Sequence, residues 1–515
     1  MTAESPASPR WLWRAVAALV AVLFVVHVAT RDDGRQWNGD AEQYTMHAEN
    51  LAAGRPYAET GWVRNTERSL TPLAYPPGYP LLLAPVVAQT GRSRAPIAFL
   101  QALCLAAMTW LFAALFWRRL SPVSVLALVL LIGLSPFFWS FVSRGLSDVL
   151  FAAAVAAALV TIGRSERSAP RRAAYGWAVV AGLAAGAAIL TRTLGVVVVP
   201  ALVVPTLWPG RRAALRPALV AAAVAVLSSA MVLGAVDWEA GGRSSGAASG
   251  AGYGEIVRSG LLDKVERIPG FAVDRAVQYT LSDASVLWSP FVIPGPGHLP
   301  IRTAGLALML LGVGVAVRRK LLAVDVFVVL YVAALLPWAF GWARYLLPVI
   351  PAAYGYLLLG GETAWQWARG RSLAYRFGVA VAVGLCAMAV GAFAVNGARA
   401  MAERAASGPS PPQSNGTDLV VRHVPDGGIL LVADDARKVT YATGRSVSEV
   451  PRDTAAWGAY ADRLGATHAL FREDRAAVAA WAPRLGWRLV ASDEAADLYV
   501  TADGAGEAPG PSPNR

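Results

Sequence analysis

The stretch "YPPGYPLLLAPVVAQTG" (residues 75–91) decides how this chain is threaded through a membrane. It is apolar, but Pro85 interrupts it and it is shorter than the roughly 20 apolar residues that a crossing helix needs. If it crossed, the basic clusters at 118–119 and 164–172 would both lie outside the cell; if it lies along the surface, both lie inside. Short loops rich in Lys and Arg stay inside. We therefore predict an interfacial helix over residues 79–90.

The rest of the chain is dominated by long apolar runs. Hydrophobic residues make up 56% of the 515 residues and charged residues 16%, whereas a soluble domain has about 25% charged residues. These runs predict an all-α polytopic membrane protein with about 11 transmembrane helices. The spans are expected near 15–30, 95–117, 121–140, 147–163, 175–191, 194–208, 217–236, 301–317, 321–340, 345–360 and 377–396.

The basic residues, which give a formal net charge of +12, gather between the apolar runs. With this threading, the inside segments hold 17 Lys and Arg against three acids, and the outside segment 31–79 holds five Arg against seven acids. The asymmetry predicts an N-terminus inside and a C-terminus outside. A nucleic-acid-binding face would place its basic residues on a soluble domain, so we exclude nucleic acid as a partner.

The composition changes after the last span. Residues 1–400 are predicted to form the transmembrane domain, with outer loops at 31–94 and 237–300. The second loop is rich in Gly and Ser and is expected to act as a flexible lid. Short strands that alternate with helices over residues 401–502 predict a small extracytoplasmic α/β domain. The Pro- and Gly-rich tail at 503–515 is predicted to be disordered.

Two carboxylates stand where predicted helices begin at the outer face. Asp40 follows the first span, and a helix would place it on one face with Tyr44, four residues later. Asp148 opens a later span. Each acid has a plain explanation as a helix cap or a first-turn acid. Acids beside a membrane are costly, however, and we predict that these two converge at an outward-facing cavity. Glu42 and Glu49 are expected on a solvated helix surface.

Two arginines are predicted at the same face of the membrane. Arg192 lies at the outer turn between two spans, and Arg344 opens another span with Tyr345 beside it. An arginine at a helix end can simply extend its charge to the interface. Two of them opposite two acids would suit a phosphate-bearing ligand, because the guanidinium fork matches phosphate oxygens. We therefore predict Tyr44, Arg192, Arg344 and Tyr345 as substrate-binding residues.

Taken in order, the short motifs of this chain resemble the GT-C fold glycosyltransferases. Within that fold they are most similar to the bacterial branch related to protein O-mannosyltransferases and aminoarabinose transferases (family 39). The resemblance covers roughly residues 10–400, and "ADDARKVTYATGR" (433–445) is similar to a domain that many bacterial members append. The motifs are "GDAEQYTMHAENLAAGRPY" (39–57), "YPPGYPLLLA" (75–84), "LSDVLF" (146–151), "LTRTLG" (190–195) and "RYLLPVIP" (344–351).

The resemblance implies an enzyme of the bacterial cytoplasmic (inner) membrane. Such an enzyme transfers a sugar, with inversion, from a polyprenyl-phosphate-linked donor to an extracytoplasmic glycan, lipid or protein acceptor. Asp40 matches the first-loop acid at the family's active site and is predicted to be the general base. Asp148 matches the second outer acid, and Arg192 and Arg344 are the implied phosphate contacts.

One pair of residues departs from the family pattern. The aminoarabinose transferases carry an acidic–basic pair just before the proline doublet, where this chain has Ala74 and Tyr75. That difference argues against a metal site of their kind and against their particular acceptor. The residues specify no certain cofactor, and a divalent metal ion is the one addition that the sequence leaves open.

Two other classes of function compete with a transferase. A lipid or glycolipid transporter, or flippase, would also have many spans, but it would place acids near the middle of the bilayer within inverted repeats. Here the acids lie at one face and no repeat is evident. A sensor or assembly protein would need only its outer domain, which leaves the large membrane region unexplained. We therefore expect a membrane glycosyltransferase.

Overall fold

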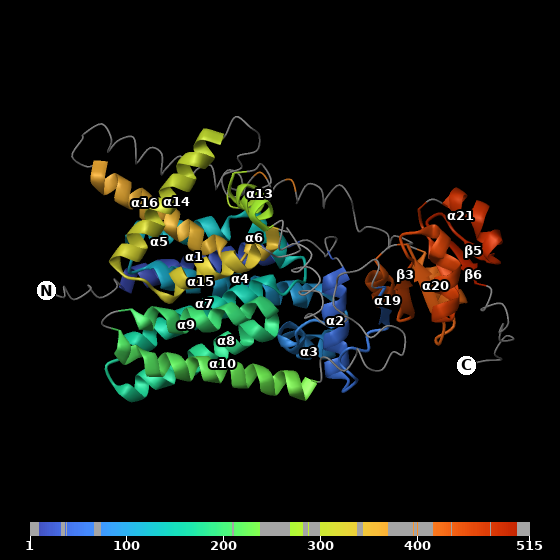
Figure 1. Ribbon diagram of the computed structural model, residues 1–515, viewed down its shortest axis with the longest axis horizontal. Helices are drawn as coiled ribbons and strands as arrows, with labels where there is room; N and C mark the ends of the chain where they lie inside the picture. Colours follow the sequence, from blue (N-terminus) through green and yellow to red (C-terminus); the bar gives the residue numbers. More distant parts are fainter. Residues whose placement is uncertain are drawn as a thin grey trace.

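The computed structural model describes most of the chain. Figure 1 shows a bundle of long helices and a smaller α/β part at one end of it, with α2 and α3 between the two. The described residues are 10–31, 37, 39–65, 74–208, 211–236, 268–281, 287, 299–336, 343–368, 395, 399, 416–433, 435–473 and 475–501.

The bundle consists of Ala- and Leu-rich helices. Six described helical segments are long and apolar enough to cross a membrane, and a bent pair adds a seventh. The chain is therefore a multi-pass membrane protein. The six segments are α1 (Arg10–Ala29), α4 (Arg94–Phe116), α7 (Asp148–Arg167), α8 (Arg171–Thr191), the segment Arg212–Val236 that contains α10 (Leu215–Val236), and α14 (Leu299–Arg319).

The span expected over 121–140 is broken in the middle. It forms the bent pair, in which α5 (Pro122–Gly133) and α6 (Pro136–Val142) meet at 54°. Pro136 has no N–H to continue the helix, and its ring disfavours helical backbone at the residue before it. Ser135 is accordingly extended, with φ −67° and ψ 121°. The break therefore follows from the proline.

The number of eleven spans stays a prediction. The segments expected at 194–208 and 321–340 contain only shorter apolar helices, Thr193–Leu207 and Ala323–Leu335. The span expected at 377–396 and most of the loop 237–300 lie outside the described residues. The remaining helices of this part are α9 (Val198–Val203), α13 (Ile268–Thr280), α15 (Ala323–Leu335) and α16 (Ile350–Ala368).

The basic clusters gather at one end of the bundle. Arg119 forms an ion pair with Asp325, with both N···O distances at 2.7 Å. Arg211 donates to the carbonyl of Leu321 at 2.6 Å. Lys320 also lies within electrostatic reach of residues in the 118–119 and 164–172 clusters. These two clusters therefore share an end of the bundle, as both threadings of residues 79–90 require.

Two short helices close the opposite end of the bundle. They are α2 (Gly39–Ala52) and α3 (Gly78–Thr90), which pack against each other (Figure 1). The start of α3 presses on the last turn of α8: a Cβ added at Gly78 would lie 2.7 Å from the carbonyl carbon of Leu190. Only a residue without a side chain allows this approach. The contact places α3 beside the turn that carries Arg192.

The C-terminal part is an α/β unit, which we call the C-terminal unit (residues 416–501). Its helices are α18 (Thr417–His423), α19 (Ala436–Thr443), α20 (Trp457–Leu464) and α21 (Arg475–Trp481). Its strands are β2 (Ile429–Val432), β3 (Ser446–Glu449), β4 (Ala466–Phe471), β5 (Arg488–Ser492) and β6 (Asp497–Val500). Apolar clusters cover both faces of the sheet, one around Val439 and Leu498 and the other around Trp457 and Phe471.

The sheet of the C-terminal unit is completed by a strand from the first outer loop. The strand order is β1-β3-β2-β4-β6-β5, in which β1 is Trp62–Val63. β1 pairs in parallel with β3, as β3 does with β2 and β2 with β4, whereas β6 is antiparallel to both β4 and β5. The first outer loop and the C-terminal unit therefore share one sheet.

Candidate active site

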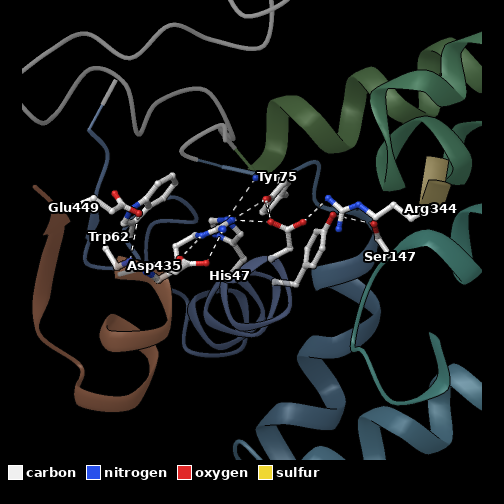
Figure 2. Close-up of polar contacts among 11 residues, drawn as sticks. His47, Trp62, Tyr75, Ser147, Arg344, Asp435 and Glu449 are labelled. Carbon is white, nitrogen blue, oxygen red and sulfur yellow. Dashed lines mark hydrogen bonds and ion pairs between the residues drawn. The ribbon is translucent and has the colours of Figure 1, made fainter. Parts of the chain in front are cut away.

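Asp40 is the centre of a buried polar cluster where α2 meets the C-terminal unit. Its Oδ1 accepts hydrogen bonds from the Tyr75 hydroxyl at 2.6 Å and from Nη1 of Arg437 at 2.7 Å. Its Oδ2 accepts from Nη2 of Arg344 at 2.6 Å (Figure 2). The residue is only 7% exposed. It is therefore not a solvated acid.

The electrostatics of the cluster favour the charged form of Asp40. Burial alone would raise the pKa of its carboxyl group. The charges of Arg344 and Arg437 and the hydrogen bond from Tyr75 outweigh burial and hold the pKa of Asp40 well below its usual range. Asp40 is thus an anion at neutral pH, and both of its oxygens are engaged by donors.

Aromatic side chains from α2 and from the segment before α3 line the cluster. The ring of Tyr44 packs against that of Tyr75, with centroids 4.6 Å apart, and its hydroxyl lies 2.9 Å from Oγ of Ser147. His47, one turn further along α2, bonds through Nδ1 to the carbonyl of Tyr57 at 2.9 Å. Burial lowers the pKa of His47 to about 4, so its ring is neutral and serves to tie the loop to α2.

A second ion pair lies beside the first. Asp148, at the start of α7 and 2% exposed, pairs with Arg192, which ends α8. The guanidinium of Arg192 lies 4.8 Å from the ring centroid of Tyr345, and that of Arg344 lies 5.4 Å from the same centroid. One aromatic ring is therefore flanked by both arginines. This is the cation–π arrangement that holds guanidinium groups in place.

The structure thus brings together the residues that the sequence singled out, from α2, α7, the end of α8 and the turn before α16. Their roles in catalysis stay a prediction. The sequence reasoning missed Tyr75 and Arg437, which both touch Asp40. Tyr75 stands in the "YPPGYP" segment, at one of the two positions that differ from the aminoarabinose transferases, and Arg437 stands in the "ADDARKV" segment. Neither segment indicated a contact with Asp40.

The expectation for Glu42 was wrong. Glu42 is 5% exposed because α19 of the C-terminal unit covers this face of α2, and its Oε2 accepts no hydrogen bond among the described residues. Burial raises the pKa of Glu42 to about 7, although nearby Lys438 opposes the shift. Glu49 is half-buried and forms an ion pair with Arg92 at 2.6 Å.

A divalent metal does not fit the side chains of this cluster. Within the described ranges, no group of three His, Cys, Asp or Glu residues converges closely enough to hold an ion. The carboxylate of Asp40 faces two arginines and a tyrosine, which are donors and do not act as metal ligands here.

These contacts define the class of protein. It is a multi-pass helical membrane protein whose buried, ion-paired carboxylates lie at one end of the bundle, beneath an α/β unit. A family model described as dolichyl-phosphate-mannose-protein mannosyltransferase matches residues 74–238. The matched segment contains Tyr75, Asp148 and Arg192. No curated protein sequence matches the chain.

Solved structures of membrane glycosyltransferases share the fold. The archaeal oligosaccharyltransferase AglB from Archaeoglobus fulgidus, in complex with an inhibitory peptide and a dolichol-phosphate, matches with a TM-score of 0.59 and 14% identity, over 89% of this chain and 69% of its own. ArnT from Cupriavidus metallidurans in the apo state matches with a TM-score of 0.57 and 16% identity, over 96% of this chain and 99% of its own. ArnT from Cupriavidus metallidurans bound to undecaprenyl phosphate matches with a TM-score of 0.56 and 17% identity, over 96% of this chain and 98% of its own. The chain therefore has the GT-C fold.

Proposed function

We propose that this protein is a membrane glycosyltransferase that moves a sugar from a polyprenyl-phosphate-linked donor to an acceptor hydroxyl, with inversion at the anomeric carbon. One observation carries the proposal: the buried carboxylate of Asp40 is held between Arg344, Arg437 and Tyr75 at one end of a GT-C bundle. Solved relatives of the same fold contain undecaprenyl phosphate or a dolichol-phosphate, which supports a lipid-phosphate donor here.

In the proposed reaction, Asp40 acts as the general base. The acceptor oxygen forms a bond to the anomeric carbon on the face opposite the phosphate, and the proton of its hydroxyl passes to the Asp40 carboxylate. The bond between the anomeric carbon and the phosphate oxygen breaks at the same time. A positioned base typically accelerates such a step by roughly 10²–10⁴-fold.

The arginines in this proposal stabilise the leaving phosphate. Negative charge builds on the phosphate as its bond to the sugar breaks, and a guanidinium group offers paired donors to two of its oxygens. Arg344 and Arg192 would receive it, and both are steadied by the ring of Tyr345. Asp148 positions Arg192 through their ion pair. Tyr44, whose ring packs against Tyr75, would contact the sugar.

We place the site on the outer face of a bacterial cytoplasmic (inner) membrane. Basic residues gather at the end of the bundle opposite Asp40, and by the positive-inside rule such an end faces the cytoplasm. The N-terminus then lies inside, and residues 401–502 form a domain outside. The acceptor is a glycan, lipid or protein exposed at that face, and α3 would lie along the membrane surface.

A transfer assay with labelled donor tests this function. The full chain, in proteoliposomes, is supplied with polyprenyl phosphate that carries a radiolabelled sugar and with an extract of cell-envelope acceptors. Label that becomes covalently attached to an acceptor is the expected result. Label that merely changes leaflet while it stays on the donor would indicate a flippase and would contradict the proposal.

A further inference from the structure

Arg437 is the residue through which the C-terminal unit reaches into the site. Its Nη1 lies 2.7 Å from Oδ1 of Asp40 and 3.2 Å from the Tyr75 hydroxyl. Its Nε and Nη2 each donate to Asp435 at 2.9 Å. Asp435 is also the N-cap of α19. The guanidinium is therefore oriented by its own helix, and Nη1 reaches across to α2.

The surrounding contacts hold this arginine against the membrane part. Trp62 of β1 lies beside Arg437, with the guanidinium carbon 5.6 Å from the centroid of the Trp62 ring. Nε1 of Trp62 donates to Oε2 of Glu449 at 3.3 Å. Asn65 donates to the carbonyl of Glu449 at 2.9 Å. The same loop therefore supplies a strand, an aromatic ring and a hydrogen bond to the C-terminal unit. Arg437 is placed at Asp40 by a continuous interface.

In this arrangement the carboxylate of Asp40 is poorly placed to accept a proton from a hydroxyl group. Oδ1 accepts two hydrogen bonds and Oδ2 accepts a third, and two of the three donors are cations. A base must instead offer an oxygen to the hydroxyl that it deprotonates. Arg344 and Arg437 approach opposite oxygens of one carboxylate, so a single anion bound beside Asp40 is within reach of both cations. A phosphate offers more oxygens and more charge than a carboxylate.

We propose that Arg437 binds the phosphate of the donor, and that its transfer from Asp40 to that phosphate frees one of the two acceptor positions on Oδ1, beside the bond from Tyr75, to accept the proton of the acceptor hydroxyl. This inference rests on the proposed function. In the reaction, the hydroxyl proton ends on Asp40, the acceptor oxygen is bonded to the sugar, and the electron pair of the broken bond stays on the lipid phosphate, which Arg437 then holds together with Arg344 and Arg192. The C-terminal unit thus couples donor binding to activation of the base.

The first arm of the test is binding of lipid phosphate to the full chain in detergent. Undecaprenyl phosphate is titrated against the wild type and Arg437→Ala, with Arg463→Ala as a matched control on an exposed part of α20. We expect Arg437→Ala to weaken binding by about tenfold or more, because a charge-assisted hydrogen bond is lost. Arg437→Lys keeps the charge and is expected to bind with intermediate affinity. The control is expected to bind like the wild type.

Inorganic phosphate provides a second arm that separates the two sources of the group. If the site serves a lipid headgroup, inorganic phosphate is expected to bind more weakly than undecaprenyl phosphate. Equal binding of the two would contradict the assignment to a lipid-linked donor.

The third arm measures how transfer depends on pH. The acid limb of kcat/KM reports the base in the free enzyme, and the acid limb of kcat reports it in the complex. We expect the limb of kcat to lie at the higher pH in the wild type, because Arg437 has then left Asp40. Arg437→Ala is expected to move the limb of kcat/KM to higher pH, toward the limb of kcat. An Arg437 that stays on Asp40 throughout the reaction would instead leave the limbs of kcat and kcat/KM at the same pH in the wild type, and Arg437→Ala would move both limbs to higher pH.

The outcomes separate this inference from the function beneath it. A wild type that binds no lipid phosphate and transfers no sugar would overturn both. A wild type that binds and transfers with its two limbs at the same pH, together with an Arg437→Ala variant of equal affinity, would overturn the role of Arg437 alone. Arg437→Lys, together with the melting temperature of each variant, identifies a loss that comes from unfolding.

Discussion

Asp40 and Glu42 are two residues apart on α2, but their surroundings oppose each other. Two arginines keep Asp40 charged, whereas Glu42 is buried against α19 without a full set of hydrogen-bond donors. The charged groups that act on Glu42 are Lys438 and Arg437 of α19, its N-cap Asp435, and Arg94 of α4, and burial outweighs their combined effect on the pKa. Neutral Glu42 is therefore favoured where the two parts of the chain meet.

The raised pKa of Glu42 makes stability depend on pH. Its pKa is about 7 in the fold against an ordinary value of 4.5. Between these values the folded chain holds a proton that the unfolded chain has released, so the free energy of unfolding falls as pH rises through this window. Glu42→Gln removes the ionisation and is expected to raise stability above pH 7 by about 3 kcal/mol, with no gain below pH 4.5.

Melting temperatures at pH 4 and pH 8 check this prediction. Glu49→Gln is the control on the same helix, because Glu49 is partly exposed and paired with Arg92. A gain in the melting temperature of Glu42→Gln that is the same at both pH values would contradict the assignment of the effect to this ionisation.

The residues of the site were predictable to the extent that they sit at helix ends. Asp40, Asp148, Arg192 and Arg344 each adjoin an apolar run, and the placement of basic clusters indicated which ends share a side. Arg437 could not be found this way, because it is 397 residues from Asp40 and its contact depends on how two parts of the chain dock. The burial of Glu42 was missed for the same reason.

At the scale of elements, β1 is the piece that joins the first outer loop to the C-terminal unit. It has only two residues, yet it extends the sheet, and Trp62 is 3% exposed in the apolar cluster between the sheet and α19. A strand this short carries no alternating pattern that predicts it from the sequence. The strand alternation over 401–502 was visible because β2 to β6 are longer and separated by helices.

Removal of the Trp62 side chain tests the importance of this joint. Trp62→Ala loses buried apolar contacts, the bond to Glu449 and the ring beside Arg437. We expect a loss of stability of about 3–5 kcal/mol, with faster proteolysis of the C-terminal unit and a lower rate of sugar transfer. Trp367→Ala, at a side chain that is 88% exposed, is the control. Equal proteolysis of the two variants would show that β1 does not hold the unit in place.

At the scale of the whole molecule, the two ends of the bundle differ in chemistry. One end holds the basic clusters together with the Arg119–Asp325 pair, and the other holds the ion-paired carboxylates and the C-terminal unit. This polarity follows from the spacing of the apolar runs, so the sequence alone predicted it. The bend at Pro136 was not part of that prediction.

The polarity predicts how the chain is oriented. Single cysteines are introduced at Ala169, in the turn after α7 at the basic end, and at Asp453, on the surface of the C-terminal unit, in a chain that lacks Cys104 and Cys386. A membrane-impermeant maleimide added to intact cells is expected to label Asp453→Cys, whereas Ala169→Cys is labelled only after the cells are opened. The reverse pattern would place the site on the inner side and contradict the proposed donor geometry.

The most direct measurement of the central claim is the rate of sugar transfer by Asp40→Asn. The substitution keeps the size of the side chain and removes its ability to take a proton, so transfer from radiolabelled polyprenyl-phosphate sugar is expected to fall by roughly 10²–10⁴-fold. Glu49→Gln on the same helix is expected to transfer at the wild-type rate, and gel filtration should show that both variants are folded. A folded Asp40→Asn variant with near-normal transfer would contradict the assignment of Asp40 as the base.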